Sequence, residues 1–110
     1  MADEDECLTW VQAVGDDVRA FPILQVLGEI GTTLSLGYLV NVGGRVLEKR
    51  TWANSVDLEK LSAAASIYGR IGRLSAGINA EKLYDTLTLL SCDNMGWLSD
   101  FAKQAFNKMT

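Results

Sequence analysis

Apolar residues alternate with polar or small ones over residues 33–52, near the middle of the chain. Side chains two apart lie on one face of a β-strand, so this alternation predicts two strands. Gly43-Gly44 lies between them, and paired glycines supply the positive φ of a tight turn. The segment therefore predicts a β-hairpin. Its proposed interaction face consists of Leu34, Leu36, Tyr38, Val40, Val46 and Trp52.

The register of this hairpin depends on the length of its loop. A three-residue loop over 42–44 places Val40 opposite Val46, whereas a two-residue loop pairs Val40 with Leu47. We favour the three-residue loop because its cross-strand pairs are apolar. A two-stranded hairpin is marginally stable alone in water. These strands are thus expected to pack on helices, pair with another strand, or pair with a second copy of the chain.

Helical spacing of apolar residues precedes the hairpin. Apolar side chains recur every three or four residues over 3–21, which predicts an amphipathic helix weakened by Gly15. Pro22 suits the start of a second, short helix, which continues to Ile30 and ends at Gly31.

Helical spacing also follows the hairpin. Asn54 is expected to cap a helix that runs to Ser75 and ends before Gly77. Asn79 is a further cap signal, but the segment 83–91 fits either a helix or a strand.

The last helix is predicted after Asp93-Asn94, a turn and cap signal. Its apolar stripe is wide and aromatic. The stripe consists of Trp97, Leu98, Phe101, Ala102, Ala105, Phe106 and Met109.

These elements predict an α+β fold in a single domain, residues 1–110. N-terminal helices come first, then the central hairpin, and then two or three C-terminal helices. A chain of this length buries enough surface for one core, and its 48% hydrophobic and 22% charged residues are typical of a globular protein.

Charge and hydropathy limit the partners that we expect. The net charge is −4, and acidic residues are concentrated in the segment 3–6, which disfavours a phosphate backbone as a ligand. No apolar run is long enough for a bilayer span. Two distant cysteines and no secretory segment predict a cytoplasmic protein without a disulfide.

The chain contains no histidine, the commonest general base and metal ligand. The glycine-rich phosphate and dinucleotide motifs and the calcium-loop motif are absent from the sequence as well. We therefore expect no catalytic residues, no cofactor and no metal. An enzyme or small-ligand binder built on carboxylates and tyrosines ranks last among the function classes.

The string Gly69-Arg70-Ile71-Gly72-Arg73 contains a Gly-x-x-Gly. This string, together with the predicted element order, resembles the type II KH domains, in which such a loop lets a nucleic-acid backbone approach. The resemblance implies a nucleic-acid-binding module with Gly69, Arg70, Gly72 and Arg73 as binding positions. The competing interpretation is that both glycines permit close helix packing while both arginines face solvent.

The segment 37–47, followed by the helix that starts at Asn54, resembles the centre of roadblock-type modules, which are homodimeric scaffolds. This resemblance covers under half of the chain. The favoured hypothesis is a non-catalytic, regulatory protein-interaction module: an accessory subunit, scaffold or inhibitor that binds a protein partner, a second copy of itself, or both. The apolar hairpin face and the aromatic last helix are its expected surface.

Overall fold

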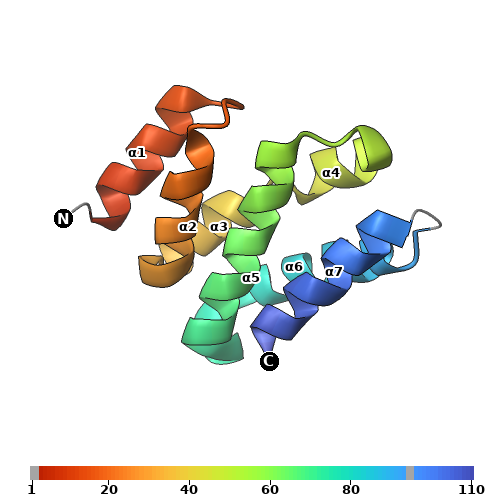
Figure 1. Ribbon diagram of the computed structural model, residues 1–110. Coiled ribbons are helices and arrows are strands. Elements are labelled where there is room, and N and C mark those ends of the chain that lie inside the picture. The colour runs from red at the N-terminus through yellow and green to blue at the C-terminus, as the bar shows by residue number, and fades with distance from the viewer. Residues whose placement is uncertain (1–2, 94–95) are drawn as a thin grey trace.

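The computed structural model describes residues 3–93 and 96–110, and every regular element in them is helical (Figure 1). The prediction of an α+β fold is therefore wrong: the described residues contain no strand. The elements are α1 (Glu4–Val14), α2 (Ala20–Ile30), α3 (Thr33–Val40), α4 (Gly43–Lys49), the short 3-10 helix η1 (Arg50–Trp52), α5 (Ser55–Ala76), α6 (Ile78–Ser91) and α7 (Gly96–Met109).

The segment 33–52, predicted as a β-hairpin, forms α3, α4 and η1. Thr32 caps α3, because its hydroxyl accepts a hydrogen bond from the Leu34 N–H. Buried residues in the segment follow one another mostly at helical spacings, not at the spacing of two that a strand requires. They are Ser35, Leu36, Leu39, Val40, Val42, Gly43 and Val46. Both predicted strand registers, and the description of the chain as a β-hairpin protein, are therefore wrong.

The Gly43-Gly44 pair begins α4 and is not a hairpin turn. Neither glycine has a positive φ. Gly43 instead permits close packing of α4 on α6, because a Cβ there would lie 2.6 Å from Oγ1 of Thr86. Gly43 thus reflects a helix contact with a segment far along the chain, whereas a Cβ on Gly44 would meet no atom within 4 Å.

The flanking helices largely confirm the sequence prediction. The first is shorter than expected, since Gly15, at a φ of 60°, ends α1 and a turn separates it from α2. The Asn54 side chain caps α5 by accepting a hydrogen bond from the Val56 N–H at 2.7 Å. Gly77 ends α5, as predicted.

The ambiguous segment 83–91 is helical, within α6. Asn79 does not cap this helix, because Gly77 occupies the N-cap position. The last predicted helix is confirmed as α7. Asn94, part of the predicted turn before it, lies outside the described residues.

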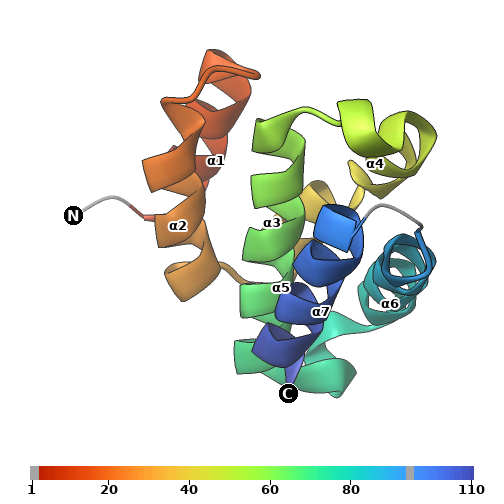
Figure 2. The same cartoon turned by 45° about the vertical axis from the view of Figure 1, so that its right-hand side comes forward.

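Helix α5 runs through the middle of the molecule (Figures 1 and 2) and packs against α2, α3, α4, α6 and α7. Helix α1 lies at one edge and packs mainly on α2, antiparallel to it. The hydrophobic core lies between α5 and the helices that pack against it. Its largest fully buried side chains are Leu24, Leu27, Leu36, Leu39, Leu61, Ile67, Leu83, Leu87, Leu90 and Leu98.

Candidate functional site

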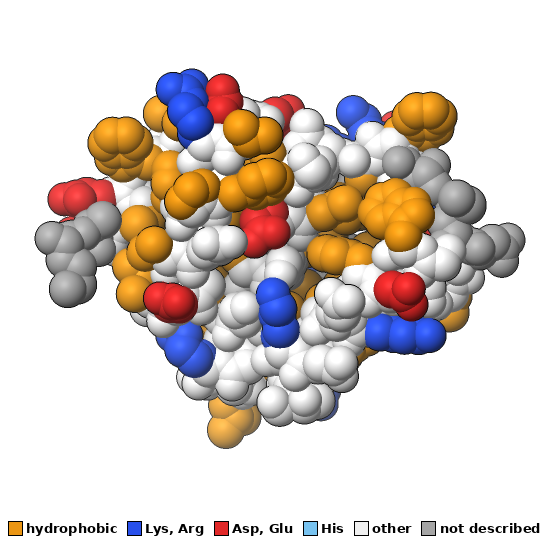
Figure 3. All heavy atoms as spheres, in the orientation of Figure 1, with side chains coloured by type: hydrophobic (Ala, Val, Ile, Leu, Met, Phe, Trp, Pro, Cys, Tyr) orange, Lys and Arg blue, Asp and Glu red, His pale blue; other side chains and the backbone are white. Residues whose placement is uncertain are grey.

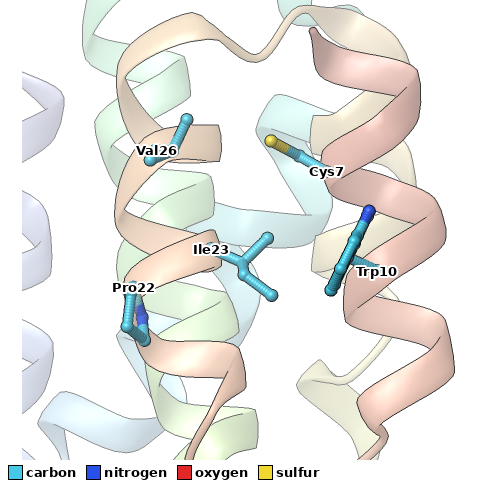
Figure 4. A pocket seen from close by; sticks show the side chains of 5 residues that line it. All are labelled: Cys7, Trp10, Pro22, Ile23 and Val26. Atoms are coloured by element: carbon cyan, nitrogen blue, oxygen red, sulfur yellow. The ribbon is translucent and has the colours of Figure 1, made fainter. Parts of the chain in front are cut away.

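An open apolar groove runs between α1 and α2 (Figure 4). Its volume is about 230 Å³. Cys7 and Trp10 project from α1 toward Ile23 on α2. The residues that line it are Cys7, Trp10, Pro22, Ile23 and Val26. Trp10 is 61% exposed, which is unusual for so large an apolar side chain, so the groove leaves much of the indole in contact with water.

The groove forms because α2 is apolar on two faces. Leu24 and Leu27 are fully buried in the core, whereas Ile23, Val26 and Ile30 follow at helical spacing on a neighbouring face. Val26 and Ile30 are more than a third exposed. Helix α1 covers this second face only in part. Figure 3 shows hydrophobic side chains gathered over α1 and α2, with acidic side chains at the margin.

The groove has an acidic end. Asp3, Asp5 and Glu6 are exposed at the start of α1, one turn or less from Cys7. Burial raises the pKa of the Cys7 thiol, and the negative charges of Asp3 and Glu6 raise it further. The charges of Asp3 and Glu6 therefore act on Cys7, a side chain that lines the groove.

Glu4 has a different role from its acidic neighbours, because it joins α1 to the start of α3. Its carboxylate accepts hydrogen bonds from the Thr32 N–H at 2.6 Å, from the Thr32 hydroxyl at 2.8 Å, and from the Ser35 hydroxyl. Burial raises the pKa of Glu4, but the hydrogen bonds from Ser35 and Thr32 outweigh it and leave the pKa below its usual value. This contact fixes the edge helix, and with it the groove.

The predicted interaction residues do not gather on one exposed surface. Leu36, Val40 and Val46 are buried in the core. Tyr38 is half-buried, beside a different cavity. Leu34 and Trp52 are exposed, at 60% and 86%. A role of these residues in an interface stays a prediction.

The Gly-x-x-Gly lies within α5 and has structural roles. A Cβ on Gly69 would lie 2.1 Å from the carbonyl oxygen of Lys108, so Gly69 permits the close approach of α7. Gly72 has a φ of 84° and kinks α5. The competing interpretation, close packing at both glycines, is thus confirmed for Gly69 only.

Arg70 does not face solvent freely, as that interpretation assumed. Its guanidinium donates to the carbonyl oxygens of Gly28 and Gly31, with the shortest distance 2.8 Å, at the end of α2. Arg73 is exposed, in a shallow hollow shared with Glu81 and Asp85. The carbonyl oxygens of Gly28 and Gly31 already engage the Arg70 guanidinium. The carboxylates of Glu81 and Asp85 beside Arg73 disfavour a phosphate there.

Both family resemblances depended on strands. The KH-like element order and the roadblock-like hairpin-then-helix unit each require the segment 33–52 to be extended, and it is helical. The resemblances of fold are therefore wrong. Nucleic-acid binding as such stays untested.

No group of three or more cysteine or carboxylate side chains able to hold a metal occurs within residues 3–93 and 96–110. In the same ranges, no helix is long and apolar enough to cross a membrane.

Comparisons with protein families, with curated proteins and with solved structures found no match to this chain. The groove between α1 and α2 is thus characterised by its own geometry alone.

Sequence reasoning missed the groove residues, although one signal was available. Leu24 and Leu27 already supply a buried stripe for α2, so Ile23, Val26 and Ile30 form a second one. A helix with two apolar faces needs two partners or leaves one face open.

Proposed function

We propose that the protein is a non-catalytic interaction module that binds a basic, amphipathic helix of a partner protein in the groove between α1 and α2. The observation that carries this proposal is an open apolar groove with an exposed tryptophan beside an acidic helix end. Helix-in-groove recognition uses apolar anchors at positions i, i+3, i+4 and i+7 of the bound helix.

Trp10 is the proposed anchor. Tryptophan is enriched among the residues that dominate binding energy, because it buries a large area with few rotatable bonds. Val26 and Ile30 extend the apolar face along α2, and each is partly exposed. A bound helix would remove these side chains from water, which favours association.

Charge supports a basic partner over a second copy of this chain. Asp3, Asp5 and Glu6 are exposed where α1 begins, and the whole chain carries a net charge of −4. Lysine or arginine residues flanking the apolar anchors would complement this end and speed association at low salt. Self-association remains a prediction, which sedimentation velocity across a concentration series tests.

The cytoplasm is the proposed compartment. Cys7 and Cys92 are both free thiols, which suits a reducing environment. Whether binding scaffolds, assists or inhibits the partner depends on that partner's identity.

The test uses a synthetic amphipathic peptide with leucines on one face and lysines on the other. In two-dimensional NMR it is expected to shift the Trp10 indole signal and the amides of α1 and α2. Val26→Glu should weaken binding about tenfold or more, because it places a charge in the apolar groove.

Leu89→Glu is the matched control, since Leu89 is an exposed leucine on α6, at 52% exposure. It is expected to leave binding unchanged. Shifts that map away from α1 and α2, or equal weakening by both variants, would overturn the proposal. A glutamate-for-lysine peptide should bind weakly if the acidic end contributes.

A further inference from the structure

A second cavity, of about 340 Å³, lies where the turn after α1, the junction of α3 with α4, and the first turns of α5 meet. It differs from the groove in being polar. The residues that line it are Asp16, Tyr38, Asn41, Val42, Arg45 and Lys60. Its volume falls in the range typical of small-ligand sites.

Lys60 is the unusual member of this lining. The residue is only 5% exposed, and buried lysines are rare unless they are paired. No carboxylate of the described residues lies within 4.0 Å of its ammonium, and no hydrogen bond from it is formed within that part of the chain. The ammonium lies over the Tyr38 ring, with Nζ 5.7 Å from the centroid.

The Lys60 ammonium opens into the cavity. No fully buried side-chain nitrogen or oxygen of the described residues lacks a hydrogen-bond partner. Since Lys60 donates no hydrogen bond to those residues, its Nζ must touch solvent, and the solvent space that Lys60 lines is this cavity. The stem is thus buried, while the charged end faces the solvent-accessible space of this cavity.

The adjacent carboxylate does not neutralise Lys60. Asp57 binds Arg45 through both of its oxygens, at 2.6 and 2.7 Å from Nη2 and Nε. This geometry leaves the Nη1 donors of Arg45 free of Asp57, and Arg45 is one of the residues that line the cavity. Burial raises the pKa of Tyr38, so its hydroxyl remains a hydrogen-bond donor at neutral pH.

We infer that this cavity is a binding site for a small oxyanion, a carboxylate or a phosphate group, held by the ammonium of Lys60 between Arg45 and Tyr38. An anion supplies the charge partner that the buried lysine lacks, in surroundings where such pairs are stronger than in water. Asp16, exposed at the rim, opposes the anion. It therefore limits the affinity of the site.

The test uses inorganic phosphate and benzoate as separate probes, titrated into the full chain at constant ionic strength. Both compounds are expected to shift the NMR signals of the Lys60 side chain and of the 41–45 amides, with saturation in the millimolar range. The stronger probe tells a phosphate site from a carboxylate site. Chloride at equal ionic strength controls for general salt effects.

Lys60→Gln should lose affinity about tenfold, and Lys60→Arg should retain it, because the arginine keeps the charge. Lys103→Gln, at an exposed lysine of α7, is the matched control and should bind as the parent does. Asp16→Asn should bind more tightly. Circular dichroism establishes that each variant is folded.

Signals of Lys60 that move without saturation, or equally with chloride, would overturn the inference. Equal affinities for the parent and a folded Lys60→Gln variant would do so as well. The titration of the parent protein with phosphate, benzoate and chloride needs no substitution, so it tests the site even if Lys60→Gln does not fold.

Discussion

Arg45 in α4 and Asp57 in α5 form a two-pronged ion pair, with Nε and Nη2 at 2.7 and 2.6 Å from the two carboxylate oxygens. The side chain of Asp57 is 3% exposed and that of Arg45 is 48% exposed. The pair joins the segment predicted as a hairpin to the central helix. Among the described residues, Arg45 is the ion-pair partner of Asp57, and no second one lies within 4.0 Å.

Arg45→Met is expected to destabilise the fold by about 2–3 kcal/mol, because it leaves a buried carboxylate without its partner. Urea unfolding followed by circular dichroism measures the change. Arg19→Met is the control: Arg19 pairs with Asp17 at an exposed position, where water screens the pair, so its loss should change the free energy of unfolding much less. Equal losses in both variants would contradict the structure.

The two glycines of α4 are expected to respond oppositely to alanine. Gly44→Ala meets no atom within 4 Å and should stabilise the helix by about 0.5 kcal/mol. Gly43→Ala places a Cβ 2.6 Å from the Thr86 hydroxyl and should cost about 1–3 kcal/mol. Thermal unfolding of both variants checks this. A hairpin turn with positive φ would be damaged at both positions, so a stabilised Gly44→Ala separates the two structures.

The hydrogen bonds of Glu4 are expected to stabilise the fold less in acid. Burial raises its pKa, but hydrogen bonds from Ser35 and Thr32 give a net pKa below the unfolded value. The contribution is therefore complete above the ordinary glutamate pKa and is lost as pH falls through the lower, folded value. Glu4→Gln should lower the free energy of unfolding by about 1 kcal/mol at neutral pH. The loss should become progressively smaller as the pH falls below the ordinary glutamate pKa.

Urea unfolding of both proteins across the acid range measures this difference. Glu81→Gln, at an exposed position of α6, serves as the control for the loss of one surface carboxylate. A gap between parent and Glu4→Gln that stays constant with pH would contradict the assigned hydrogen bonds.

The two cysteines are expected to react at different rates. Cys92 is exposed, whereas Cys7 is 4% exposed and has a pKa raised by burial and by Asp3 and Glu6. The thiolate is the reactive form, so iodoacetamide should modify Cys92 first. Mass spectrometry of the partly modified protein identifies the order. Preferential modification of Cys7 would contradict its burial in the wall of the groove.

Most helices could be predicted from the sequence, because their caps, end signals and apolar spacing lie within or next to each helix. Asn54 and Gly77 are a cap and a stop that act on their own neighbours, and the stripe of α7 repeats at helical spacing. The segment 33–52 was predicted wrongly because Leu34, Leu36, Tyr38 and Val40 also fit a period of two. Leu39 would face away from Leu36 and Val40 in a strand, but all three side chains are buried, which fits a helix. This burial depends on the packing of α3 against α5 and α6.

The candidate sites depend even more on distant residues. The role of Gly43 appears only once Thr86 is opposite it, and that of Gly69 only once Lys108 is. Lys60 lies at an ordinary position in an amphipathic helix, and nothing near it in sequence signals a cavity. The second apolar face of α2 could be predicted from the sequence. Its exposure could not, because that depends on how much of the face α1 covers.

Helix α5 packs against α2, α3, α4, α6 and α7, whereas α1 packs mainly on α2 and is joined to α3 through Glu4. Detachment of α1 would therefore uncover little of the core and leave the other helices together. Its amides should exchange with deuterium through a partial opening well below the global unfolding free energy. A ligand bound against α1 would slow that exchange. The exchange rates of the α1 amides therefore report whether the groove is occupied.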